Sequence, residues 1–279
     1  MRVLITGGSG FIGLRMIKAL QDKAEVISFS RAAPKEETRA RVLCGAFHRF
    51  EDLRQLDNQK IDVLLHLGAV TGGCSEEDGI EINVAGTRRL VRYLLDRGCR
   101  KFVLASSIAA TGCLGGSFIP RKLPMPDDHP CLAVDMYGLS KAMMEEEIRY
   151  FSRQCSDGDF MCLRLGAVVD DAGGAFTPVK AGDAMWGPFC QLAHVSISDI
   201  VHGAGLAVHA QREPGFRLYN MVGPDSSCAD PVRAVLRPLF GEADLDLSHY
   251  EHPGREFDPI YSIEGARAGL GYNPAVSLR

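Results

Sequence analysis

A glycine-rich loop near the N-terminus constrains the fold of this chain more than any other stretch. Apolar residues at 3–5 lead into Thr6-Gly7-Gly8-Ser9-Gly10-Phe11-Ile12-Gly13, and an amphipathic segment at 14–20 follows. This order predicts a strand, a tight turn and a helix. Glycines let the backbone turn sharply and let a diphosphate approach without meeting a Cβ, while the first N–H groups of the helix point at the same anion. The stretch therefore predicts a dinucleotide-binding site.

Strand patterns and helix patterns alternate along the chain after this loop. Strands are expected at residues 25–30, 41–45, 61–69, 101–105 and 159–166. Helices are expected at residues 52–59, 81–97 and 135–154. Alternation of this kind predicts an α/β fold with a Rossmann-type doubly wound parallel sheet.

The alternating pattern loosens after Gly166. We therefore expect a dinucleotide-binding Rossmann domain at 1–166 and a small substrate-binding part at 167–279, of which about 196–224 returns to the Rossmann sheet. Residues 170–191 are rich in Gly and Pro, and we interpret them as a substrate lid.

Composition and charge narrow the possible partners. The net charge is −4 and no basic cluster is present, which argues against a nucleic-acid partner. The run Glu145-Glu146-Glu147 is interpreted as a solvated helix face. Met1 leads straight into a strand pattern and no apolar run is long enough for a bilayer, so neither a signal peptide nor a membrane span is expected. The nine cysteines are scattered and neither they nor the histidines show zinc-ligand spacing, which indicates reduced thiols, a cytoplasmic protein and no metal site.

The ends of the expected strands indicate where a ligand binds. Ligands of a doubly wound sheet lie beyond the carboxyl ends of its strands. The residues at those ends are Gly7, Ser30, Gly68, Ser107 and Gly166. We expect them to lie along the edge that holds the cofactor.

Ser30-Arg31 at the end of the second strand bears on the choice of cofactor. An NAD site usually has Asp or Glu about 20 residues past the glycines to bind the ribose 2′-hydroxyl. Ser-Arg at this place can bind a 2′-phosphate instead, so we predict a preference for NADP(H) over NAD(H). In the alternative interpretation, Arg31 only stacks on the adenine or lies in solvent.

Tyr137 and Lys141 carry the predicted chemistry together with Ser107. A phenol and an ammonium four residues apart share one face of a helix. The ammonium and a positively charged nicotinamide both favour the phenolate, so Tyr137 is expected to transfer a proton while hydride moves at the same substrate carbon. Ser107 is expected to hydrogen-bond the reacting oxygen, and Lys141 to bond the nicotinamide ribose as well.

With these motifs in place, the sequence resembles the extended short-chain dehydrogenase/reductase family, also called the NAD-dependent epimerase/dehydratase family. The glycine spacing Gly7-x-x-Gly10-x-x-Gly13 is typical of short-chain dehydrogenases, although Gly8-x-Gly10-x-x-Gly13 also fits the general dinucleotide fingerprint. The other matching pieces are His66-Leu67-Gly68-Ala69, Asn83-Val84-Ala85-Gly86-Thr87, Ser106-Ser107, Tyr137-Gly138-Leu139-Ser140-Lys141 and Leu163-Arg164.

The resemblance implies a Ser107-Tyr137-Lys141 triad, a bound nicotinamide cofactor and a sugar or sugar-nucleotide substrate. It also implies a homodimer built on two helices per subunit, around 83–97 and 137–154. The cofactor is expected to contact Gly7, Gly10, Phe11, Ile12, Gly13, Ser30, Arg31, Phe47, Leu67, Gly68, Ala69, Thr71, Asn83, Ala105, Tyr137, Lys141 and Gly166. Asn83 matches a family position near the nicotinamide, and a role in positioning a helix fits it equally well.

Three departures from the family pattern affect the expected ligand. Ala46-Phe47 stands where many members have an acidic residue for adenine, so Phe47 is expected to pack on the base instead. Ala167 replaces an Asn that touches the substrate. Gln191-Leu192 stand where an Arg often binds a nucleotide diphosphate. Each departure weakens the case for a nucleotide-sugar ligand.

Three functions remain open from the sequence. The first is an NAD(P)-dependent oxidoreductase that acts on a hydroxyl or carbonyl carbon of a sugar-like or other small polar substrate. The second is a nucleotide-sugar epimerase with tightly bound cofactor. The third is a non-enzymatic dinucleotide sensor, which the retained Ser107, Tyr137 and Lys141 disfavour.

Overall fold

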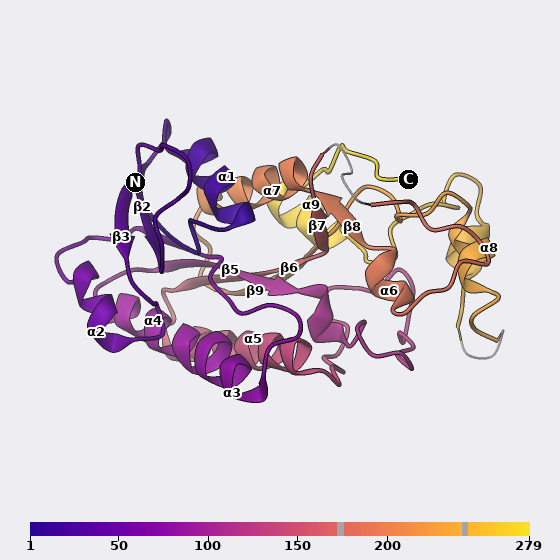
Figure 1. Cartoon of the computed structure of the whole chain (residues 1–279), viewed down its shortest axis with the longest axis horizontal. Coiled ribbons are helices and arrows are strands. Elements are labelled where there is room, and N and C mark those ends of the chain that lie inside the picture. The colour runs from indigo at the N-terminus through magenta and orange to yellow at the C-terminus, as the bar shows by residue number, and fades with distance from the viewer. Residues whose placement is uncertain (172–175, 242–244) are drawn as a thin grey trace.

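Seven parallel strands form the central sheet of the computed structural model (Figure 1). The structure describes residues 1–171, 176–241 and 245–279. Every neighbouring pair of strands runs parallel. In their order across the sheet, the strands are β3 (Arg41–Cys44), β2 (Glu25–Ser30), β1 (Arg2–Thr6), β4 (Val63–His66), β5 (Lys101–Ser107), β6 (Asp159–Leu165) and β9 (Gly215–Met221). The direction of the strand order reverses between β1 and β4, which confirms the predicted doubly wound Rossmann sheet.

Helices cover both faces of the sheet, and the inner strands β4 and β6 are buried along their whole length. In Figure 1, α1 (Phe11–Leu20) and α7 (Ile197–His209) lie on one face, and α4 (Thr87–Leu95) and α5 (Met136–Gln154) lie on the other. Strand β1 shows why: Val3 and Ile5 belong to the core under α1 and α7, whereas Leu4 between them belongs to the opposite core. None of the helices in the described residues combines the length and the apolar character needed to cross a bilayer.

The C-terminal part gathers beyond the carboxyl ends of the strands, at the right of Figure 1. Strands β7 (Ala167–Val169) and β8 (His194–Ser196) form a separate two-stranded parallel sheet. The chain returns to the main sheet as β9, which pairs with β6. The short elements of this part are α6 (Pro188–Gln191), α8 (Val232–Leu236), η4 (Ser248–Glu251) and α9 (Glu264–Leu270).

The expected lid at 170–191 contains residues 172–175, which lie outside the described residues. In the rest of this segment, Val179 forms an isolated bridge to Cys228, and the chain then enters α6. The segment therefore crosses the carboxyl edge of the sheet before it reaches β8 (Figure 1).

The predicted helix at 81–97 was wrong at its start and in its regularity. The helical segment begins at α3 (Glu76–Asp78), where the Ser75 hydroxyl accepts a hydrogen bond from the Asp78 amide. It continues as a π-helical stretch, η2 (Gly79–Gly86), before α4 ends at Leu95. Within η2, the side chain of Asn83 accepts a hydrogen bond from the backbone amide of Val70 and donates one to its carbonyl. The wider π-helical turn thus contains a residue whose side chain is bonded outside the helix.

Two other predicted elements have different bounds. The helix predicted at 52–59 begins earlier, as α2 (Phe50–Leu53), and then tightens into the 3₁₀-helix η1 (Arg54–Leu56). The strand predicted at 61–69 is shorter in the structure, where β4 extends from Val63 to His66. Residues 67–69 leave the sheet and line a cavity, so their apolar character serves the site rather than the strand.

We predict that Gly13→Ala destabilises the fold, because an added Cβ would lie 2.1 Å from the backbone oxygen of Gly7. Relief of that clash requires the loop to move, and the expected cost is about 1–3 kcal/mol. The matched control is Gly205→Ala on α7, where nothing lies within 4 Å of the added Cβ, and it is expected to be neutral or stabilising by up to about 1 kcal/mol. Urea denaturation measures both changes, and equal midpoints for Gly13→Ala and the wild type would contradict the prediction.

Candidate active site

The structure places most of the predicted cofactor-binding residues around one cavity of about 530 Å³ at the carboxyl ends of β1, β2 and β4. The predicted residues that line it are Gly7, Gly10, Phe11, Ile12, Gly13, Ser30, Arg31, Phe47, Leu67, Gly68, Ala69 and Thr71. The lining also includes residues that the sequence did not single out, among them His48, Ile82 and Val168. Val168 and Ile82 reach the cavity from distant parts of the chain, so no local pattern could have identified them.

The loop between β1 and α1 fits a dinucleotide diphosphate. Gly7 has a left-handed φ of +71°, and a Cβ there would lie 2.9 Å from the backbone of Leu67. Gly10 is the N-cap of α1 and provides no side-chain cap, so the first N–H groups of the helix lack a side-chain partner. These groups belong to residues that line the cavity. Free N–H groups at the positive end of a ten-residue helix suit an anion such as a diphosphate.

The end of β2 carries the two residues that bear on the ribose. Ser30 is buried, and its hydroxyl accepts a hydrogen bond of 3.3 Å from the amide of Ser9. Arg31 is exposed and lines the cavity. In the described part of the chain, Arg31 takes part in no ion pair. Its guanidinium is therefore available to an anionic ligand.

Phe47 lies against the cavity wall. Its ring meets that of His66 edge to face with the centroids 4.8 Å apart, and a Cβ on Gly68 would lie 2.9 Å from a Phe47 ring carbon. His66 is buried between the hydroxyls of Thr6 and Thr87, at 2.6 Å from Nδ1 and 2.9 Å from Nε2. Burial, and secondarily Lys141, lower the pKa of His66 to about 3, so its ring is neutral and structural.

Ser107, Tyr137 and Lys141 come together at the carboxyl end of β5. Ser107 ends that strand, Tyr137 lies in the first turn of α5, and Lys141 follows one turn later. The Ser107 hydroxyl accepts a hydrogen bond of 3.1 Å from the Ala109 amide and lies near enough to the Tyr137 phenol to lower its pKa. The Nζ atom of Lys141 lies 5.9 Å from the centroid of the Tyr137 ring and donates a hydrogen bond of 2.7 Å to the carbonyl of Ala105.

The electrostatics of this group correct one expectation. The sequence predicted that the ammonium of Lys141 favours the phenolate of Tyr137. In the structure, burial raises the pKa of Tyr137, and the nearby Ser107 hydroxyl opposes that rise only in part. Burial also lowers the pKa of Lys141 to about 8, because its ammonium is enclosed in the protein. The phenol is therefore neutral near pH 7 in the protein alone.

Five predicted cofactor residues do not line the cavity. Asn83 donates to the Ser140 hydroxyl at 2.9 Å as well as pairing with Val70, which is a helix-positioning role. Ala105 contributes its carbonyl to Lys141. Gly166 is enclosed, since a Cβ there would lie 2.4 Å from the carbonyl oxygen of Ala193. Tyr137 and Lys141 also lie outside the lining of this cavity, at the end of the neighbouring strand β5.

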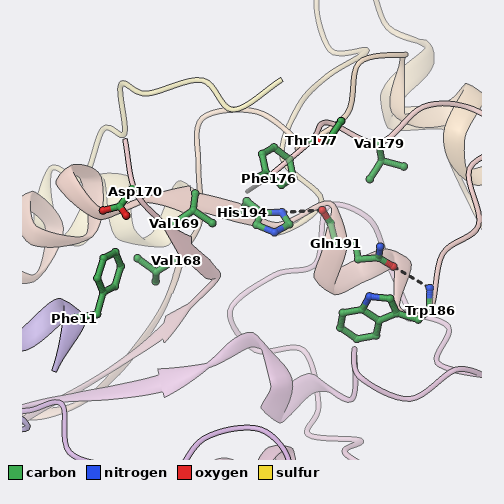
Figure 2. Close-up of a pocket in the computed structure, with 10 residues that line it drawn as sticks. All are labelled: Phe11, Val168, Val169, Asp170, Phe176, Thr177, Val179, Trp186, Gln191 and His194. Atoms are coloured by element: carbon green, nitrogen blue, oxygen red, sulfur yellow. Dashed lines mark hydrogen bonds between the residues drawn. The ribbon is translucent and has the colours of Figure 1, made fainter. Parts of the chain in front are cut away.

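A second cavity of about 520 Å³ adjoins the first (Figure 2). Phe11 and Val168 line both cavities, so the two are neighbours. The second is bounded by β7, by the start of β8 and by the region of α6, all in the C-terminal part. The fold thus brings a cavity of the C-terminal part against the cavity at the glycine loop.

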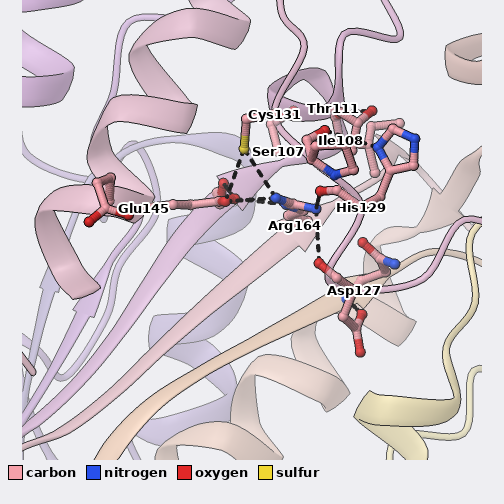
Figure 3. A network of polar contacts seen from close by, with 12 residues as sticks. Ser107, Ile108, Thr111, Asp127, His129, Cys131, Glu145 and Arg164 are labelled. Atoms are coloured by element: carbon pink, nitrogen blue, oxygen red, sulfur yellow. Dashed lines mark hydrogen bonds and ion pairs between the residues drawn. The ribbon is translucent and has the colours of Figure 1, made fainter. Parts of the chain in front are cut away.

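A buried ion pair fixes α5 to the sheet below the triad (Figure 3). Glu145 on α5 and Arg164 on β6 are at most 1% exposed, and their Oε2 and Nη2 atoms are 2.8 Å apart. Ser106 donates a hydrogen bond of 2.6 Å to Glu145. The interpretation of Glu145 as part of a solvated face was therefore wrong. Glu145 follows Lys141 by four residues, and that spacing alone indicates the inward face of the helix.

The same network reaches the loop before α5 and the C-terminal part. Arg164 donates to the backbone carbonyls of Asp127 and His129 at 3.1 and 3.3 Å. The carboxylate of Asp127 accepts a hydrogen bond of 2.6 Å from the amide of Asn220 on β9. Burial raises the pKa of Asp127 to about 6, although the Asn220 amide and Arg164 both oppose that rise.

Comparison with known proteins identifies the class to which this fold and site belong. The model of the NAD dependent epimerase/dehydratase family matches residues 3–170, and the chain belongs to this family. This membership makes the chain an enzyme, an oxidoreductase or an epimerase.

Relatives by sequence include dehydrogenases and epimerases. The chain is 26% identical to D-erythronate dehydrogenase of Cupriavidus necator, over 91% of this chain and 87% of that protein. It is 29% identical to UDP-glucose 4-epimerase 3 of Oryza sativa subsp. japonica, over 58% of this chain and 47% of that protein. The chain thus spans about half the length of that epimerase.

Solved structures share the fold. A short-chain dehydrogenase/reductase superfamily protein of Agrobacterium tumefaciens, solved with bound NAD, superposes with a TM-score of 0.74 at 21% identity and covers 100% of this chain and 94% of that one. UDP-glucose 4-epimerase of Thermotoga maritima, solved with UDP-glucose, superposes with a TM-score of 0.71 at 19% identity and covers 100% and 95%. At these identities the likeness establishes the fold alone.

The raised pKa of Asp127 predicts a pH-dependent loss of stability. Between its ordinary value of 3.8 and its folded value of about 6, the folded protein holds a proton that the unfolded chain has lost. The contribution of this group to stability is therefore greatest below about pH 4 and falls as pH rises to about 6, by at most about 3 kcal/mol.

Asp127→Asn removes this titration and keeps an oxygen for the Asn220 amide. Urea denaturation of both proteins at several pH values gives the difference in unfolding free energy. We expect the wild type to lose stability relative to Asp127→Asn from about pH 4 to about pH 6. A difference that does not vary across this range would contradict the prediction.

Proposed function

We propose that this chain is an NAD(P)-dependent oxidoreductase that acts at a hydroxyl or carbonyl carbon of a small, polar, sugar-like substrate. The observation that carries the proposal is the grouping of Ser107, Tyr137 and Lys141 at a strand end beside the dinucleotide cavity. The match to D-erythronate dehydrogenase, which extends over most of both chains, supports net oxidation or reduction.

Each side chain of the triad has a role that its surroundings favour. When bound, the nicotinamide supplies or accepts a hydride. Tyr137 lies near Ser107, and its neutral phenol can donate a proton to a substrate carbonyl oxygen, while its phenolate can receive one in the reverse direction. The Ser107 hydroxyl stabilises negative charge on the same oxygen. Lys141 is held by the Ala105 carbonyl, from where its ammonium can bind a ribose hydroxyl.

We assign the cofactor and the substrate to the two neighbouring cavities. We assign cofactor binding to residues 1–166 and substrate binding to residues 167–279, with the adenine end near Phe47 and the diphosphate at residues 10–13. We also propose a homodimer through the helices around 83–97 and 137–154. Exposed apolar side chains on α5, at Leu139 and Met143, support this interface. The free thiols of the described chain suit a cytoplasmic location.

A nucleotide-sugar epimerase is the second candidate, because UDP-glucose 4-epimerases match more than half of the chain. Against it stand Ala167 and Gln191, which replace residues that bind such ligands in the family pattern. An epimerase that regenerates its cofactor keeps it through dialysis and turns over without net change in the reduced-nicotinamide absorbance. Cofactor that is retained through dialysis, together with turnover that leaves the reduced-nicotinamide absorbance unchanged, would favour this candidate over the oxidoreductase.

Arg31 is expected to select NADP over NAD. A guanidinium that pairs with a 2′-phosphate contributes a charged hydrogen bond, so Arg31→Ala is expected to weaken NADP binding about tenfold or more. NAD binding is expected to change by about twofold at most, since NAD lacks the phosphate. Calorimetric titration of both cofactors measures the effect. The control is Arg39→Ala, an exposed arginine that pairs with Asp22 and lies outside the cavity lining. An equal loss of affinity for NADP and NAD would contradict a contact between Arg31 and the 2′-phosphate.

Tyr137→Phe is expected to lower kcat about 100-fold or more, because proton transfer loses its donor. Cofactor affinity is expected to stay within about threefold. The control is Tyr150→Phe, a tyrosine exposed on the same helix. Turnover is followed at the reduced-nicotinamide absorbance with a panel of sugars, sugar acids and nucleotide sugars. Unchanged turnover in Tyr137→Phe would eliminate the proposed proton transfer.

A further inference from the structure

The second cavity offers hydrogen-bonding groups that the proposed hydride and proton transfers do not use (Figure 2). Its volume of about 520 Å³ lies in the range of small-molecule sites. It adjoins the proposed cofactor cavity, with which it shares Phe11 and Val168. The chemistry of its walls therefore bears on what the substrate is.

His194, the first residue of β8, provides a hydrogen-bond acceptor. Its Nδ1 atom lies 2.9 Å from the carbonyl oxygen of Gln191. A carbonyl only accepts, so Nδ1 carries the ring proton. Burial lowers the pKa of His194, which keeps the ring neutral near pH 7 and leaves a lone pair on Nε2. Within the described chain, Nε2 receives no hydrogen bond. The Phe176 ring, 4.1 Å away between centroids, holds the imidazole in this orientation.

Gln191 provides a donor beside this acceptor. Its Oε1 atom accepts hydrogen bonds from the backbone amides of Trp186 at 2.9 Å and Gly187 at 3.1 Å. Two N–H donors at the same atom identify it as the oxygen, so the other amide atom is an NH₂ group with protons to donate. A hydroxyl group both donates and accepts one hydrogen bond. An imidazole acceptor and an amide donor on one cavity wall therefore suit the hydroxyl groups of a ligand.

Among the described residues that line the cavity there is no lysine or arginine, and Asp170 is the one formally charged side chain. Arg15 lies outside the lining and pairs with Asp170, with Nη2 and Oδ1 3.0 Å apart. A carboxylate or phosphate on a ligand would lose hydration and would meet the Asp170 carboxylate, whose positive partner is already engaged. A neutral ligand avoids this cost.

We propose that this cavity binds a neutral polyhydroxylated substrate, a sugar or polyol that bears neither carboxylate nor phosphate, and that His194 Nε2 accepts a hydrogen bond from one of its hydroxyls. The inference rests on the proposed function of the adjoining cofactor site. It distinguishes this chain from the acid and the nucleotide sugar that the names of its relatives indicate. His194 acts as a specificity-determining residue and takes no part in proton transfer.

The test compares neutral and anionic compounds of equal carbon number. Erythritol with D-erythronate, D-glucose with D-gluconate, and UDP-glucose are each titrated into the full-length protein in saturating NAD⁺ or NADP⁺, and binding is followed by ligand-observed NMR. We expect a neutral member of at least one pair to bind about tenfold or more tightly than its anionic counterpart. Tighter binding of the anionic members, or binding of none, would overturn the proposal.

Variants of His194 test the residue itself. His194→Phe keeps a ring against Phe176 and removes the acceptor, so KM for the bound neutral compound is expected to rise about tenfold or more, with kcat within about threefold. His194→Gln retains an acceptor at similar reach and is expected to recover part of the loss. His209→Ala, an exposed histidine on α7, is the control. An unchanged KM in His194→Phe would overturn the assignment of His194.

The two proposals fail in different ways. If no compound is oxidised or reduced but a neutral sugar binds in a His194-dependent manner, the oxidoreductase function fails and the binding site stands. If D-erythronate or D-gluconate is turned over with a lower KM than its neutral partner, the oxidoreductase function stands and the inference about the substrate fails.

Discussion

The buried pair of Glu145 and Arg164 is the interaction on which the geometry of the active site depends. Both charges are removed from water, which is costly unless every polar atom finds a partner. Here Ser106 and two backbone carbonyls complete the network (Figure 3). Loss of either charge would leave the other buried alone, at a cost of about 3–5 kcal/mol. The pair thus fixes α5, which carries Tyr137 and Lys141, to β6, and the hydrogen bond from Ser106 fixes it to β5, the strand that ends in Ser107.

The same network connects the two halves of the chain. Arg164 holds the loop at 127–129 by its backbone, and Asp127 in that loop binds the amide of Asn220 on the returning strand β9. The helix that carries Tyr137 and Lys141, the loop at 127–129 and the returning strand β9 are therefore joined by one connected set of buried hydrogen bonds.

Much of the fold was predictable because its determinants are local. Glycines at 7, 10 and 13 act within one turn, and the fully apolar β4 is recognisable by itself. The Tyr137–Lys141 spacing puts both side chains on one helical face without knowledge of the fold. From these features the sequence predicted the doubly wound sheet and the grouping of Ser107, Tyr137 and Lys141.

The features that were missed depend on contacts between distant residues. Glu145 stands in a run of three glutamates, and its partner Arg164 lies 19 residues away in the sequence. The π-helical segment at 79–86 contains Asn83, which is anchored to Val70 13 residues away. The raised pKa of Tyr137 results from burial by the assembled chain. The acceptor on His194 exists because Gln191 presents its carbonyl to the opposite ring nitrogen.

The central claim is that Ser107, Tyr137 and Lys141 face the nicotinamide of a dinucleotide that binds at the glycine loop between β1 and α1. A crystal structure of the protein with bound NAD⁺ or NADP⁺ tests it most directly. We expect the diphosphate to lie at the N-terminus of α1 and the nicotinamide ring to lie beside Tyr137, with Lys141 at the adjoining ribose. A dinucleotide bound elsewhere, or a nicotinamide directed away from Ser107 and Tyr137, would contradict it.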